Sequence, residues 1–117
     1  MTNALPVGTI IMARYTYGDE ILHYKFYAIT GYTPKKVRIQ EVDSLVTYDD
    51  GKEGPHYYDA PKHIRPIIDK NNCAMLIGDS KLVAYKVENG RMTFKPAEYY
   101  MFAGAWDGKP RAIYNLH

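Results

Sequence analysis

Apolar and polar residues alternate along most of the chain in short runs, and glycine, proline, asparagine or aspartate separates one run from the next. Alternation of this kind predicts β-strands that bury one face, and the breaks predict turns between them. In the first half of the chain the runs predict strands at 9–17, 21–30 and 36–43. Their β-branched and aromatic residues disfavour a helix, because such side chains lose rotamer freedom there.

The second half of the chain continues the pattern with shorter runs. The polar segment 49–55 indicates an exposed hairpin loop, and Pro66 marks its run as an edge strand or a bulge, because proline cannot donate to a ladder. Asn89-Gly90 is a strong signal for a two-residue hairpin. Residues 96–105 are compatible with one short helix that begins at their proline. The remaining strands are predicted at 63–68, 73–77, 82–87, 91–94 and 112–116.

These elements predict the fold class. A chain of 117 residues suits one domain, and we expect a single domain over residues 1–117. Short strands in so small a chain hide their edges by closing on themselves or by forming a second layer. We therefore predict an all-β fold, a small bent barrel or roll with SH3-like geometry in the N-terminal half.

Alternation along residues 21–30 predicts which side chains face outward. The residues that share a face with Tyr24 and Phe26 are the more apolar set, so this face is expected to meet the core. His23, Lys25 and Tyr27 occupy the opposite face and are expected to be exposed. A shift of one residue in register would exchange the two faces.

The composition argues against a disulfide-built protein and against a membrane-spanning one. The chain has a net charge of +2, 12 tyrosines and a single cysteine, Cys73. One cysteine cannot form an internal disulfide, and its apolar neighbours predict a buried thiol. The sequence contains no signal-peptide pattern and no run of about 20 apolar residues, so we expect a cytoplasmic protein with no membrane partner.

The sequence contains no recognisable motif for metal binding or catalysis. The four histidines lack the spacing of zinc sites, and the acidic segment 49–53 does not match a calcium loop. No nucleophile elbow, P-loop or dinucleotide fingerprint occurs. We expect no metal, no cofactor and no enzymatic activity.

The tyrosines and cations of the first three runs are expected to share one exposed face. Neighbours across a strand pair lie about 5 Å apart, and aromatic planes beside cations suit base stacking and phosphate binding. The candidate ligand-binding residues are Tyr15, Tyr17, His23, Lys25, Tyr27 and Arg38. A second candidate group is Lys109 and Arg111, at a tight turn where Trp106 is expected to anchor the core.

Two segments resemble a family of small proteins carried by phages and plasmids. Residues 26–39 resemble its FYxV and TxKxV motifs, and residues 103–110 contain the tryptophan-led WDGKP motif. Residues 15–22 depart from the family's pattern. The resemblance implies a mobile element inside a host cell, where small β proteins often act against host machinery or defences.

Three functional hypotheses follow. The first is an accessory protein that binds an anionic ligand carrying a base, either nucleic acid or a signalling nucleotide, with a homo-oligomer where a closed pocket forms between subunits. The second is a protein-binding inhibitor of a host enzyme, which would use a tyrosine-rich surface or the edge strand near Pro66. The third is an enzyme whose site is assembled from scattered residues.

Overall fold

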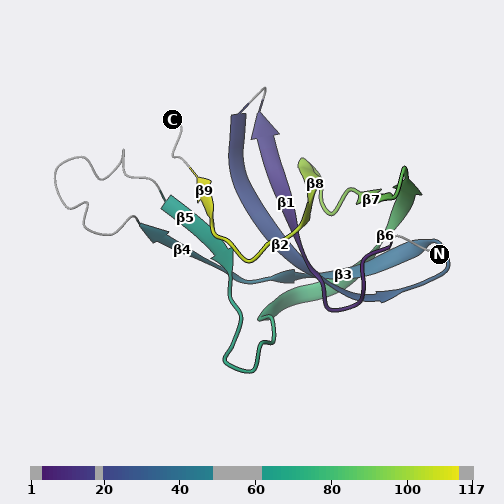
Figure 1. Ribbon diagram of the computed structural model, residues 1–117, viewed down its shortest axis with the longest axis horizontal. Helices are drawn as coiled ribbons and strands as arrows, with labels where there is room; N and C mark the ends of the chain where they lie inside the picture. The colour runs from purple at the N-terminus through teal and green to yellow at the C-terminus, as the bar shows by residue number, and fades with distance from the viewer. Residues whose placement is uncertain (1–3, 18–19, 49–61, 114–117) are drawn as a thin grey trace.

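The computed structural model describes residues 4–17, 20–48 and 62–113, and these residues form strands without any helix (Figure 1). This confirms the predicted all-β class. The strands are β1 (Ile10–Tyr17), β2 (Glu20–Tyr32), β3 (Lys36–Val42), β4 (Ser44–Tyr48), β5 (Lys62–Pro66), β6 (Leu76–Glu88), β7 (Arg91–Phe94), β8 (Tyr100–Ala105) and β9 (Arg111–Ile113).

Two antiparallel sheets make up the described part of the chain. The larger sheet has six strands in the order β7-β6-β3-β2-β1-β8, and the smaller one has three in the order β4-β5-β9. The larger sheet curls until its two end strands meet, where Phe94 of β7 stacks on Phe102 of β8 with ring centroids 4.7 Å apart. This nearly closed sheet is the small bent barrel that the sequence predicted.

The long strand β2 is buried on both faces at its centre. Tyr27 and Ile29 lie in one apolar cluster with the side chains of β1, β3 and β7, inside the barrel. Phe26 and Ala28 lie in a second cluster with Ile64 of β5, so the smaller sheet covers the outer face of the barrel at this point. The prediction that Tyr27 is exposed is therefore wrong, because alternation reports one buried face and this strand has two.

The helix considered for residues 96–105 does not form. These residues turn back through a bridge between Ala97 and Tyr100 and then pair with β1 as strand β8. The open edge of β1 supplies a full ladder of hydrogen bonds, and tyrosine and phenylalanine favour a strand over a helix. Proline at the start of a segment favours a helix only where no neighbouring strand offers the same backbone groups a sheet ladder instead.

The structure confirms some of the other sequence predictions and contradicts others. Asn89 and Gly90 form the predicted tight hairpin, with both residues at positive φ of 53° and 79° between β6 and β7. The strands expected at 73–77 and 82–87 correspond to one long strand, β6, which begins only at Leu76 and has an irregular segment that contains Gly78 at φ 71°. Cys73 is exposed, not buried. The hairpin loop predicted at 49–55 lies outside the described residues.

Pro66 does not lie on an edge strand. Its strand β5 is the middle strand of the smaller sheet, between β4 and β9. Pro66 pairs with Ser44 of β4, whereas the ladder to β9 involves only Lys62 to Ile64. Proline is tolerated here because the side of β5 on which it would have to donate a hydrogen bond has already lost its partner strand.

Candidate functional site

A cluster of aromatic and charged side chains lies on the inner face of the barrel, at the end of the apolar core. Antiparallel pairing across five strands creates it, because Tyr15 is opposite Tyr100 and Tyr27 is opposite Glu41. The cluster consists of Tyr15, Lys25, Tyr27, Glu41, Lys81 and Tyr100, and we call it the tyrosine–lysine cluster.

Both lysines of the cluster lie against tyrosine rings. The ammonium nitrogen of Lys25 is 4.9 Å from the centroid of the Tyr100 ring, and that of Lys81 is 5.4 Å from the centroid of the Tyr27 ring. At these distances the negative face of the ring attracts the cation, by about 0.5–1 kcal/mol in an exposed setting. The rings therefore hold the two cations without neutralising their charge.

The tyrosines continue as a row toward solvent. The ring of Tyr15 is 5.6 Å from that of Tyr100 and 6.5 Å from that of Tyr99, with tilted planes in both pairs. Tyr99 precedes β8 and is 69% exposed, more than any other large apolar or aromatic side chain of the described part. The row runs from the buried ring of Tyr27 to a ring that stands in solvent.

Charges and burial in the cluster shift three titrations. Burial, together with the carboxylate of Glu41 and the phenol of Tyr100, raises the pKa of Tyr27 to about 12. Burial and Glu41 also raise the pKa of Tyr100 above its usual value. Partial burial and the neighbouring ammonium of Lys25 lower the pKa of Lys81, and Glu41 opposes them. The ammonium groups of Lys25 and Lys81 thus repel each other, and the carboxylate of Glu41 partly offsets this repulsion at Lys81.

His23 lies next to the cluster on the same strand as Lys25. It pairs across the ladder with Tyr15, and its Nδ1 atom is buried without a hydrogen-bond partner among the described residues. A buried, unpartnered ring nitrogen costs stability. The structure therefore brings together His23, Lys25, Tyr15 and Tyr27 of the predicted site.

Other predicted site residues do not join the cluster. Arg38 is exposed on the opposite face of β3, and its Nη1 lies 3.5 Å from the hydroxyl of Ser80. Strand alternation explains this, because Val37 and Ile39 on either side of it point into the barrel core. Tyr17 ends β1, and its side chain lies outside the described part.

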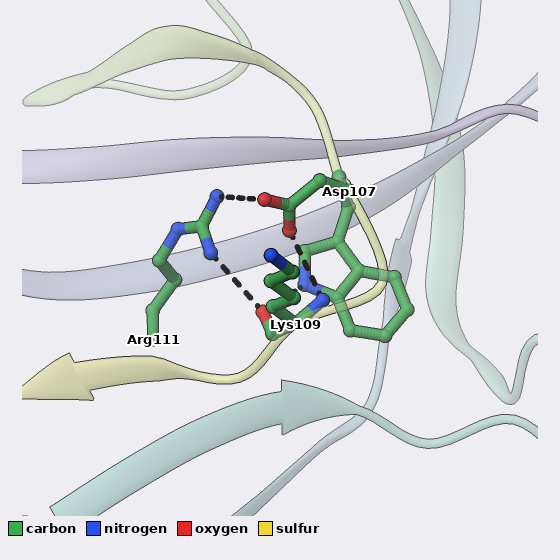
Figure 2. Close-up of polar contacts among 4 residues, drawn as sticks. Asp107, Lys109 and Arg111 are labelled. Carbon is green, nitrogen blue, oxygen red and sulfur yellow. Dashed lines mark hydrogen bonds and ion pairs between the residues drawn. The ribbon is translucent and has the colours of Figure 1, made fainter.

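Figure 2 shows the turn that holds the remaining two predicted residues. Arg111 forms an ion pair of 3.0 Å with Asp107, and it donates a hydrogen bond to the carbonyl oxygen of Lys109 at 3.3 Å. The amide of Lys109 donates to Asp107, and the indole of Trp106 donates to the Lys109 carbonyl at 2.7 Å. The hydrogen bond from Arg111 is the main reason why the pKa of Asp107 is lowered. Within this turn, Arg111 is already occupied.

Trp106 attaches this turn to the outer face of the barrel. Its ring meets the buried ring of Phe26 edge-on at 6.0 Å, in the apolar cluster opposite the one that contains Tyr27. Its backbone amide extends the ladder by donating to Ile10. Trp106 is thus placed as the structural anchor that the sequence predicted, and the turn lies on the face away from the tyrosine–lysine cluster.

Two surface hollows lie elsewhere on the barrel. One, of about 410 Å³, is lined by residues that include Val7, Ile29, Cys73 and Leu76. The other, of about 320 Å³, lies between β6, β7 and β8. Both linings are mainly apolar and include no residue of the cluster.

The described residues contain no group of three or more histidine, cysteine or acidic side chains that could hold a metal ion. None of their elements is a helix with the length and apolar character needed to cross a membrane. No protein-family model, curated protein or solved structure matches the chain.

Sequence reasoning missed Lys81, Tyr99, Tyr100 and Glu41 as members of the candidate site. The two tyrosines lay in the segment considered as a helix, where they have no defined neighbours. Pairing residues 100–105 with the first strand would have placed Tyr100 opposite Tyr15. That pairing is the signal that could have found them.

Proposed function

We propose that this chain is a non-catalytic binding module for an anionic ligand that carries a base, either nucleic acid or a signalling nucleotide, and that it binds this ligand at the tyrosine–lysine cluster. One observation carries the proposal. Lys25 and Lys81 lie on tyrosine faces, and the only direct ion pair among the described residues is the distant one between Asp107 and Arg111.

The chemistry of the cluster suits both parts of such a ligand. A phosphate placed between the two ammonium groups would form charge-assisted hydrogen bonds and relieve their mutual repulsion. The rings of Tyr15 and Tyr99 offer flat surfaces on which a base stacks. Glu41 supplies an acceptor for the amino group of a base.

The resemblance to phage and plasmid proteins supports a setting for this activity. We propose an accessory protein of a mobile element that works in the cytoplasm of the host cell. Sequestering or covering a nucleotide ligand would there act against a host defence. This setting rests on residues 26–39 and 103–110 and is independent of the geometry of the cluster.

The proposal is tested by removing the two charges. The double variant Lys25→Gln with Lys81→Gln should bind a labelled oligonucleotide at least about tenfold more weakly than the unaltered protein, since each charged contact contributes about 1.5–3 kcal/mol. The matched control is Lys35→Gln with Lys70→Gln, which removes two exposed lysines from turns and should bind normally.

A further variant separates charge from packing. Lys25→Arg with Lys81→Arg retains both charges and should retain most of the affinity. If the glutamine variant binds as tightly as the unaltered protein while its urea midpoint is unchanged, the cluster is not the binding site.

The second candidate is a protein-binding inhibitor of a host enzyme, and one observation favours it. Met75, Leu76 and Ile77 are exposed at the start of β6, and β7 pairs only with residues 85–88 of that long strand. An open strand edge beside apolar side chains suits the addition of a partner's strand. Under this function Leu76→Lys with Ile77→Lys would abolish inhibition, whereas the two cluster lysines would be dispensable.

A further inference from the structure

Tyr99 is held in a backbone conformation that tyrosine seldom adopts. Its φ is +69°, and the turn around it is closed by a hydrogen bond from the amide of Tyr100 to the carbonyl of Ala97 at 3.1 Å. Positive φ is uncommon outside glycine and asparagine, because the Cβ atom crowds the backbone. A bulky aromatic residue at this position therefore costs stability that asparagine or glycine would not cost.

This conformation presents the ring to solvent beside the cluster. The side chain is 69% exposed, and its ring centroid lies 6.5 Å from that of Tyr15. Tyr15 is in turn 5.6 Å from Tyr100, on which the ammonium group of Lys25 lies. Residues held in such sparsely populated backbone conformations cluster at active sites and at sites that hold ligands.

The open character of this row selects among base-containing anions. A free nucleotide is normally held in a concave pocket that covers most of its surface. Among the described residues, the two hollows of about 320 and 410 Å³ have mainly apolar linings that include no tyrosine of this row. Proteins that bind single strands combine exposed aromatic rings for successive bases with cations along the backbone, and need no enclosed pocket.

We infer that the ligand is a single-stranded nucleic acid and that Tyr99 is an external stacking platform for one of its bases. The inference rests on the proposed function, which it deepens by naming the class of ligand. In this arrangement one base stacks on Tyr99, its neighbour contacts Tyr15, and the phosphates between them approach Lys25 and Lys81. A double helix does not fit, because its bases already stack on each other.

The test uses labelled single strands of about 12 nucleotides, a length within the usual range of site sizes. Oligothymidylate and oligouridylate distinguish DNA from RNA, and unlabelled thymidine monophosphate and duplex DNA serve as competitors. The informative variant is Tyr99→Asn, because asparagine tolerates positive φ. Tyr99→Phe is its matched control, because it keeps the ring and loses only the hydroxyl.

The expected result is a loss of affinity without a loss of stability. Tyr99→Asn should bind the single strand at least about fivefold more weakly, the lower limit for losing one stacked base, with an unchanged or higher urea midpoint. Tyr99→Phe should bind like the unaltered protein. Tyr99→Gly also accepts positive φ, so it should repeat the loss seen with asparagine.

The results that would contradict the inference differ from those that would contradict the proposed function. If thymidine monophosphate competes as well as the single strand, the ligand is a nucleotide; the inference then fails and the proposed function stands. If Tyr99→Asn and Tyr99→Gly both bind normally, Tyr99 is not a platform. If no probe binds, the inference fails; if the Lys25→Gln and Lys81→Gln variant binds every probe normally, the proposed function fails as well.

Discussion

The ammonium group of Lys25 lies 4.9 Å from the centre of the Tyr100 ring, although the two residues belong to the second and eighth strands. The contact exists because β1 lies between these strands and pairs with both. Pairing of both strands with β1, not local sequence, therefore brings the cation and the ring together. We expect one set of residues to maintain the packing of the fold and a different set to contact a ligand.

Trp106 should be a determinant of stability. Its ring packs edge-on against Phe26 and its indole donates to the Lys109 carbonyl. Trp106→Ala should lower the free energy of unfolding by about 3 kcal/mol, near the lower limit for aromatic truncations because the ring is only partly buried. Trp106→Phe should cost less, because it keeps the apolar contact and loses the hydrogen bond. Urea unfolding measures both, and a loss below about 1 kcal/mol for alanine would show that the ring is not an anchor.

Tyr27 should make the fold sensitive to alkali. Burial is the main reason that its pKa rises to about 12 in the folded protein, against 10.0 for an ordinary tyrosine. Between these values the unfolded chain loses this proton and the folded chain keeps it, so stability falls as the pH rises. Two pKa units correspond to about 3 kcal/mol. Tyr27→Phe should therefore lose less stability between pH 10 and pH 12. Urea midpoints across this range test it, and parallel declines in the two proteins would refute it.

Arg111 should support the turn and not the ligand. Trp106 is the only tryptophan of the chain, so its fluorescence reports on the turn directly. Arg111→Ala removes the ion pair to Asp107 and the bond to the Lys109 carbonyl, and should shift the emission toward that of an exposed indole. Oligonucleotide affinity should not change. A clear loss of affinity with unchanged emission would return Arg111 and Lys109 to the binding site.

Cys73 should react readily in the folded protein. Its thiol is exposed beside the apolar hollow that Val7 and Leu76 help to line. Titration with a chromogenic disulfide should modify one thiol per chain at native conditions, at a rate close to that in urea. A thiol that reacts only after unfolding would contradict the exposed position.

The sequence carried enough information for the class of fold and for several of its strands. Alternation and turn residues predicted β1, β2 and β3, and Asn89-Gly90 predicted its hairpin, because these signals are local. The face of Tyr27 could not be predicted, since a strand with a core on each side loses the contrast between apolar and polar faces. Residues 96–105 were ambiguous because only pairing with a distant strand determines their conformation.

The residues of the candidate site were likewise predicted where local signals place them and missed where distant strand pairing does. Lys25 and Tyr15 were found because they lie on two strands that follow each other in the sequence and pair, and such pairing is easily anticipated. Lys81 was missed because it lies on β6, and the pairing of β6 with β3 determines its position. The irregular segment around Gly78 makes the register of that pairing unpredictable. Arg38 was wrongly included in the candidate site. Its exposure was predicted correctly, but the face of the sheet on which it lies was not.

The most direct measurement of the central claim is the salt dependence of single-strand binding. Each phosphate contact made by a lysine contributes about 0.7 to the slope of log affinity against log salt. Lys25→Gln with Lys81→Gln should therefore reduce the slope by about 1.4, whereas Lys35→Gln with Lys70→Gln should leave it nearly unchanged. Equal slopes for the cluster variant and the unaltered protein would contradict the assignment of the tyrosine–lysine cluster as the binding site.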